Sequence, residues 1–254
     1  MLSASWQALP KHQLRRLGTE SFGFGSTSYW NGFYERKHGS GQGAHAFEWF
    51  SAVHTRQPAV WDWLCSRVRK EERLLHIGCG TSELGVALSA ELLTNVDNVD
   101  TSPAAIAHMH SRFGATEACR FTQMDALALQ YADCTFGTIV DKGTFDVFGF
   151  APVSEQTPAT ASKPLLLPRE RQACMLRECD RVLAGGGRLI QITADPPEQR
   201  IDTVLATLTG WQRSFVCFGG ESEDSGDDSC GFEYYAYCFE KPNNGTTVSP
   251  QNTT

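Results

Sequence analysis

The sequence lacks three features that would each have pointed to a specific class of protein. No apolar run approaches the ~18 to 20 residues that a membrane-spanning helix needs, so we expect a soluble protein with no membrane partner. The nine cysteines form no Cys-x-x-Cys pair and no Cys/His block, so we expect reduced, buried thiols in an intracellular compartment and no metal site. A basic excess is also missing, since the formal net charge is −7, and we expect no nucleic-acid partner.

Acidic residues are missing from the first nineteen positions, which carry Lys11, Arg15 and Arg16. This composition is typical of a mitochondrial transit peptide, and also of an ordinary N-terminus that happens to be basic. We predict a mitochondrial location, with the cytoplasm as the alternative. We predict four segments: a transit segment (1–19), an N-terminal aromatic lid segment (20–57), a main domain (58–240) and a polar tail (241–254).

From residue 58 onward, apolar patterns alternate between helical periodicity and short strand-like runs. Helices are predicted from Pro58, across 84–92, from Ser102-Pro103 as N-cap and first position, and across 169–183 with Gly185 as a stop. Strands are predicted at 74–77, up to Asp100, at 121–124, at 138–140 and at 189–193. This alternation predicts a doubly wound α/β fold, a parallel sheet with right-handed crossovers.

The last part of the chain departs from this alternation. Aromatic-rich runs at 211–218 and 232–240 are separated by a loop, which predicts a C-terminal antiparallel hairpin and brings the sheet to seven strands. Residues 151–167 contain three prolines and predict an exposed insertion. The acidic loop 221–228 lies between the last two strands, and it is either a solvated loop or a substrate contact.

Candidate functional residues follow four successive strands of the predicted sheet. Gly78 and Gly80 follow the first strand, where glycine lets a ligand approach the backbone. Asp100 ends the second strand, where a carboxylate can accept hydrogen bonds from ribose hydroxyls. Asp125 follows the third strand and can accept from an adenine amino group, or it is a turn aspartate. Asp141 follows the fourth strand.

The glycine loop indicates which nucleotide-like cofactor is bound. A dinucleotide fingerprint needs a third glycine three positions after Gly80, where the sequence has Glu83. A carboxylate at a helix N-terminus would repel a pyrophosphate. S-adenosylmethionine has no phosphate and carries a positive sulfonium, so the sequence favours it over NAD.

Three segments together resemble a known family. Residues 75–84 (LHIGCGTSEL), 141–146 (DKGTFD) and the aromatic segment with Tyr29-Trp30 and FEWF at 47–50 are similar to class I S-adenosylmethionine-dependent methyltransferases, and within them to small lysine methyltransferases. The resemblance implies the seven-stranded class I methyltransferase sheet and a protein-lysine substrate. It also implies cofactor contacts from a set of ten positions: Trp30, Tyr34, Trp49, Gly78, Gly80, Asp100, Thr101, Asp125, Ala126 and Lys142.

Two branches of that family compete for the substrate. AIAHM at 105–109, LIQ at 189–191 and YYAY at 234–237 resemble the branch that methylates citrate synthase, which we predict as partner. The Tyr29-Trp30 pair resembles the branch that methylates an elongation factor, which is the alternative. A non-catalytic methyltransferase-like binding domain is the non-enzymatic rival, and a nicotinamide oxidoreductase is the enzymatic one.

Asp141 is our candidate catalytic residue, because a carboxylate beside the cofactor can orient an attacking amine or take its proton. His76 is interpreted as a packed strand residue, and Asp195-Pro196-Pro197-Glu198 as a turn.

Overall fold

A computed structural model describes residues 23–39, 48–49, 53, 57–69, 72–114, 116–150, 167–219 and 233–243. The predicted transit segment 1–19, residues 151–166 of the predicted insertion, the acidic loop 221–228 and most of the polar tail therefore lie outside the described residues. Within the described part, no helix is both long and apolar enough to span a bilayer. Nor do three or more potential metal-ligating side chains gather there.

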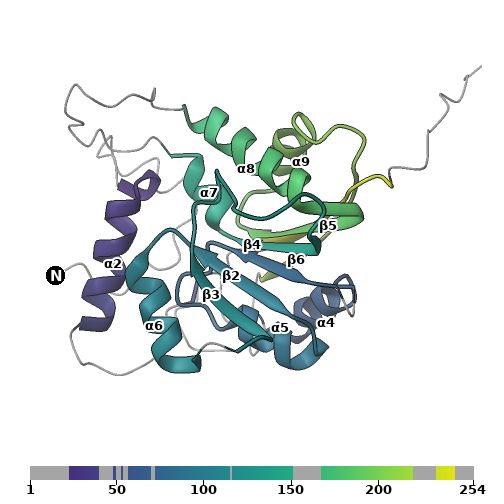
Figure 1. Cartoon of the computed structure of the whole chain (residues 1–254). Helices are drawn as coiled ribbons and strands as arrows, with labels where there is room; N and C mark the ends of the chain where they lie inside the picture. Colours follow the sequence, from purple (N-terminus) through teal and green to yellow (C-terminus); the bar gives the residue numbers. More distant parts are fainter. Residues whose placement is uncertain are drawn as a thin grey trace, which may run out of the picture.

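One sheet organises the described chain, and its strands run in the order β3-β2-β1-β4-β5-β7-β6 (Figure 1). The first five strands are parallel, while β7 pairs antiparallel with both β5 and β6. The seven strands are β1 Leu74–Ile77, β2 Val96–Asp100, β3 Cys119–Gln123, β4 Phe136–Lys142, β5 Leu183–Thr193, β6 Gln212–Gly219 and β7 Glu233–Glu240. The predicted sheet and its C-terminal hairpin are thus confirmed.

Helices cover both faces of this sheet. Leu64 and Leu88 bring α4 and α5 onto one face, and Leu176 and Val204 bring α8 and α9 onto the other. The helical segments are η2 Gly23–Gly25, α2 Thr27–Gly39, α4 Pro58–Cys65, α5 Leu84–Leu92, α6 Pro103–Phe113, α7 Thr144–Phe148, α8 Pro168–Val182 and α9 Pro197–Leu205. Figure 1 shows α2 beside α6, at one end of the sheet.

Local signals account for several of these boundaries. Ser102 caps α6 as predicted, accepting a hydrogen bond from the Ala105 amide at 3.2 Å, and Pro103 occupies the first position. His76 is fully buried in β1, with its Nδ1 3.0 Å from Asn98 Oδ1, which confirms the packed strand histidine. Burial lowers the pKa of His76 to about 4, so this ring is neutral near pH 7.

Two expectations were wrong. Gly185 does not stop α8, because the chain becomes extended at Leu183 and continues directly into β5. The segment 195–198 is more than a turn, because Pro197 occupies the first position of α9, where a missing N–H costs nothing.

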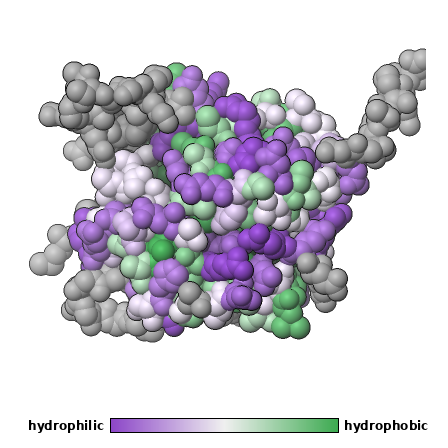
Figure 2. All heavy atoms as spheres, viewed as in Figure 1, coloured by the Kyte–Doolittle hydropathy of each residue, from purple (hydrophilic) through white to green (hydrophobic). Residues whose placement is uncertain are grey.

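The surface on the side shown in Figure 2 is largely hydrophilic, and apolar residues appear there in small separate groups. The fully buried side chains instead include large apolar residues such as Phe136, Phe145 and Phe239. Burial of such side chains is the main force that holds the two helical layers to the sheet.

Candidate functional site

The loop after β1 is built for close approach of other groups to its backbone. Gly78 and Gly80 both have positive φ, +60° and +51°, a conformation that other residues rarely adopt. A Cβ at Gly78 would overlap the Thr144 side chain of α7, and one at Gly80 would overlap the Tyr34 hydroxyl of α2. Glycine is therefore required at both positions, by conformation and by space.

Asp100, at the carboxyl end of β2, fixes this loop. Its Oδ2 accepts a hydrogen bond from the Gly80 amide and its Oδ1 accepts one from the Ser102 amide, each at 2.8 Å. Burial raises the pKa of Asp100 above its usual value, against the opposing effect of these amides. Since each carboxylate oxygen has two lone pairs, both can still accept a hydrogen bond from a ligand hydroxyl.

Helix α2 lies over this end of the sheet and is held there by polar contacts. Asn31 Oδ1 accepts hydrogen bonds from Ser102 Oγ at 3.2 Å and from the Ala104 amide at 3.1 Å, which adds a second cap to α6. The hydroxyls of Thr27 and Thr101 are 3.1 Å apart. The predicted residue Thr101 thus lies where α2 meets β2.

The three predicted aromatic residues come together beside the glycine loop. The Trp30 ring centroid is 6.0 Å from that of Trp49 and 6.2 Å from that of Tyr34. Trp30 Nε1 donates to the Phe24 carbonyl at 2.7 Å. Tyr34 is buried, and burial raises the pKa of its hydroxyl well above the usual value. Half-buried aromatic faces at this position can attract a cation.

Lys142 makes a contact that the sequence patterns did not reveal. Its ammonium forms an ion pair with Glu48 at 3.0 Å and donates to the Trp49 carbonyl at 3.3 Å, and both charged side chains are largely buried. The Lys142 ammonium lowers the pKa of Glu48 despite the opposing effect of burial. Because 93 residues separate Lys142 from Trp49, no local sequence pattern could have predicted these contacts of Lys142.

Glu48 also occupies the N-terminus of α5. Its carboxylate accepts hydrogen bonds from the Glu83 amide at 2.9 Å and from Ser82 Oγ at 3.0 Å. In dinucleotide-binding folds, the amides at the start of this helix hold a pyrophosphate. A protein carboxylate that already binds those donors disfavours a phosphate-containing cofactor there. This geometry supports the preference for S-adenosylmethionine over NAD.

Asp141 is buried at the end of β4, and both of its carboxylate oxygens accept hydrogen bonds from other groups of the protein. Oδ1 accepts hydrogen bonds from the Thr144 and Phe145 amides at 3.0 and 3.2 Å, and Oδ2 accepts one from Gln191 Nε2 at 2.8 Å. Burial is the main reason that the pKa of Asp141 is raised to about 6, with a further contribution from the nearby Asp146. The carboxylate caps the start of α7, which suits an orienting role better than direct proton removal.

The adenine-side candidates are placed at the end of β3. Asp125 is exposed, and its Oδ1 accepts a hydrogen bond from the Leu127 amide at 2.9 Å, as in an ordinary aspartate turn. Ala126 is buried beside it. The predicted contact of Asp125 with adenine stays a prediction.

A buried arginine near Asp141 was also missed. Arg200 of α9 is 1% exposed, and its Nη2 donates to Asp146 Oδ1, to Thr193 Oγ1 at 2.8 Å and to Asp195 Oδ2 at 2.9 Å. The hydroxyl of Tyr237 donates to the Asp195 carbonyl at 2.8 Å. These residues lie at the carboxyl ends of β4 and β5, next to the predicted site.

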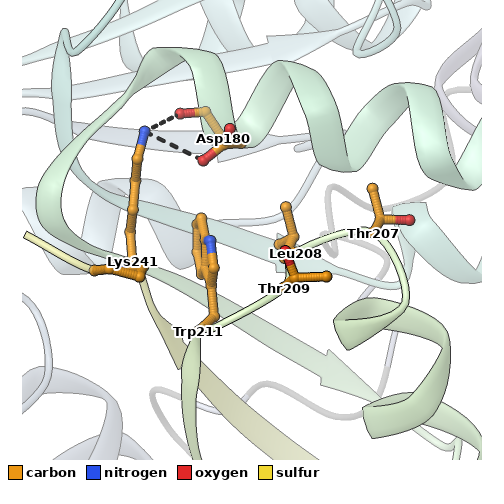
Figure 3. A pocket seen from close by; sticks show the side chains of 7 residues that line it. Asp180, Thr207, Leu208, Thr209, Trp211 and Lys241 are labelled. Atoms are coloured by element: carbon orange, nitrogen blue, oxygen red, sulfur yellow. Dashed lines mark hydrogen bonds and ion pairs between the residues drawn. The ribbon is translucent and has the colours of Figure 1, made fainter. Parts of the chain in front are cut away.

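A separate pocket of 330 Å³ lies at the opposite edge of the sheet (Figure 3). Trp211 and Leu208 line it, and Lys241 points across it toward Asp180, with which it forms an ion pair of 3.2 Å. Lys241 also donates to the Leu183 carbonyl at 3.0 Å, at the start of β5. Ligands of open α/β sheets bind at the carboxyl ends of the strands, so this pocket is not the candidate site.

Comparison with known proteins agrees with this geometry. A family model described as a methyltransferase domain matches residues 69–222. The chain is 27% identical over 232 residues to the EEF1A lysine methyltransferase 4 of Bos taurus, an alignment that covers 91% of this chain and 82% of that protein. It is 31% identical over 170 residues to the eEF1A lysine and N-terminal methyltransferase of Mus musculus, covering 66% of this chain and only 20% of that relative.

Solved structures share the fold at low sequence identity. A SAM-dependent methyltransferase from Methanosarcina mazei aligns with a TM-score of 0.53 and 13% identity, over 71% of this chain and 97% of that one. The [4+2]-cyclase SpnF aligns equally well, with a TM-score of 0.53 and 16% identity, over 73% of this chain and 80% of that one. The second likeness shows that the fold alone does not determine the reaction.

Proposed function

Because this chain belongs to the methyltransferase-domain family and S-adenosylmethionine is its cofactor, we propose that it methylates a lysine of a translation elongation factor. The observation that carries the proposal is the similarity, over 91% of the chain, to a protein named as an EEF1A lysine methyltransferase. The comparisons favour the branch that the sequence analysis kept as its alternative. Citrate synthase stays a prediction, which these similarities do not support.

The residues at the carboxyl edge fit the cofactor. The Asp100 carboxylate can accept hydrogen bonds from ribose hydroxyls, the positive-φ glycines allow a close approach to the backbone, and the aromatic cluster around Trp30 offers ring faces to a cation. The cofactor supplies a methyl group on an already activated sulfonium. The protein must therefore chiefly align a neutral amine with that group and exclude water.

A lysine amine is protonated near pH 7, so it must lose a proton before it can react. Burial in a low-dielectric site lowers a lysine pKa, and a nearby carboxylate can orient the amine. In this scheme Asp141 holds the start of α7 in place, and its ionisation near pH 6 sets the local charge. We therefore expect an acidic limb in the pH dependence of turnover: turnover should fall as the pH drops below about 6.

The test offers purified elongation factor and purified citrate synthase, separately and together, with labelled S-adenosylmethionine. Methylated lysines are then mapped by mass spectrometry. An Asp100→Ala chain serves as the control with an impaired cofactor site. Methylation of the elongation factor alone supports the proposal, whereas methylation of citrate synthase alone reverses it in favour of the first prediction. Methylation of neither, with S-adenosylmethionine bound, supports the non-catalytic rival.

The cellular location remains a prediction from residues 1–19, which lie outside the described residues. Imaging of a tagged full-length chain and of one without those residues tests it. Loss of mitochondrial signal on removal of the segment would establish mitochondrial targeting and would support citrate synthase as the substrate. A cytoplasmic signal for both chains would rule out targeting by that segment.

A further inference from the structure

The buried guanidinium of Arg200 joins α9 to α7 and to the end of β5. It contacts Asp146 on α7 and Thr193 and Asp195 at the end of β5. Thr193 Oγ1 in turn donates to both Asp146 oxygens at 2.9 Å and accepts a hydrogen bond from the Asp195 amide at 3.0 Å. These four side chains, together with the Asp195 amide, form a closed network, which we call the Arg200 clamp.

Helix α7 depends on contacts of this kind. It has five residues, too few to form a stable helix by itself. The Arg200 guanidinium carbon lies 4.6 Å from the centroid of the Phe145 ring, so the clamp contacts two consecutive residues of α7. On the opposite side, Thr144 Oγ1 donates to the Ile77 carbonyl at 3.2 Å, at the start of the glycine loop. Helix α7 thus connects the clamp to the cofactor side of the site.

A buried arginine with this arrangement is costly. Its Nε and Nη1 atoms have no hydrogen-bond partner among the described residues, so all its polar contacts pass through Nη2. A close-packed apolar group of the same volume would often give equal or greater stability than a buried ion network. This cost points to a role beyond stability.

We propose that Arg200 is a positioning residue for methyl transfer, which fixes α7 against β5 by holding Asp146 and Asp195 together. Through α7, the clamp sets the positions of the Asp141 carboxylate and of the glycine loop. The clamp is part of the methyltransferase fold itself and acts in the same way whichever protein is the substrate.

The groups that act on Asp141 come from three packed elements. They are Asp146 on α7, Arg200 on α9 and the Gln191 amide on β5. The Cys179 thiol on α8 also lies near Asp141, which helps raise the pKa of that thiol. Arg200 lowers the pKa of Asp141, whereas Asp146 raises it. Removing the guanidinium charge should therefore move the acidic limb of turnover to higher pH, and lysine at this position should restore it in part.

Hydrogen exchange tests the clamp without any protein substrate. In Arg200→Met and in the milder Asp195→Asn, amides of α7 should exchange about tenfold faster or more, because a charge-assisted bond that holds the helix is lost. Amides of β2 should keep their wild-type rates. Arg181→Met is the matched control, since Arg181 has a comparable set of bonds to Glu178, Asp133 and the Tyr131 carbonyl, away from the site.

Faster exchange confined to α7 in the two clamp variants, with the limb moved to higher pH in Arg200→Met and partly restored in Arg200→Lys, supports the proposal. Wild-type exchange of α7 in Asp195→Asn and Arg200→Met overturns it, as does an equal acceleration in Arg181→Met. If Arg200→Met does not fold, Asp195→Asn decides alone. If the wild-type chain methylates neither candidate protein, the proposed function fails while the exchange result still decides the clamp.

Discussion

Replacing Asp141 by asparagine removes a buried negative charge and leaves that side chain with hydrogen-bond partners. Its Oδ1 can still accept from the Thr144 and Phe145 amides. The new amide group would face Gln191, whose Oε1 is buried and has no hydrogen-bond partner among the described residues. Rotation of the Gln191 amide would turn that oxygen toward the new donor. We therefore expect the variant to fold.

The size of the effect follows from the pKa of Asp141, which burial raises from 3.8 to about 6. Between these values the folded state holds a proton that the unfolded state has lost, so stability falls as pH rises through this window. The total loss in the free energy of unfolding is about 3 kcal/mol at neutral pH. Asparagine does not ionise and avoids this loss.

Urea denaturation of both chains, from about pH 4 to about pH 8, measures this difference directly. The stability of the variant relative to the wild-type chain should rise by about 3 kcal/mol across that range. A difference that does not change with pH would refute the reasoning, because it would mean that Asp141 is not ionised at a cost in the fold.

Turnover of the same Asp141→Asn variant tests the functional role of the carboxylate. If the ionised carboxylate orients α7 and the amine, turnover should fall by about 100-fold or more, with its acidic limb near pH 6 removed. Affinity for S-adenosylhomocysteine should change much less. Equal losses in turnover and affinity would place Asp141 in the cofactor pocket instead.

Three further predictions concern the cofactor side. Asp100→Ala should weaken S-adenosylmethionine binding by about tenfold or more in calorimetry, whereas Asp97→Asn, a buried aspartate earlier on the same strand, should lower stability with affinity unchanged. Gly78→Ala should destabilise the chain by about 1 to 3 kcal/mol in urea, because of its positive φ and the overlap with Thr144. Tryptophan fluorescence should change on addition of S-adenosylhomocysteine, and the change should shrink in Trp30→Phe; an unchanged signal would mean that Trp30 only packs.

Much of the fold could be predicted because its signals are local. The cap at Ser102, the proline at Pro103 and the glycines after β1 each act within a few residues. Helix α9 was missed because two successive prolines are typical of a turn, while the first helical position also tolerates proline. Helix α2 was missed because its glycines and aromatic residues give no apolar stripe, and contacts with distant α6 hold it in place.

The site was predicted less completely, for a physical reason. The residues at strand ends could be found because parallel strands bring their carboxyl ends to one edge. The partners that hold those residues are distant in the chain, as with Glu48 beside Lys142 and Arg200 beside Asp146. Single-sequence patterns carry no information about such pairs.

The position of β7 between β5 and β6 has a consequence for synthesis on the ribosome. Strand β5 gains its antiparallel neighbour only when residues 233–240 have emerged, and β6 emerges earlier with no partner beside it. Until then the nascent chain presents an unpaired, apolar strand edge, which other chains can join. Translation that stalls before residue 233 should therefore leave a product that chaperones retain, although every residue predicted to contact the cofactor has already been made.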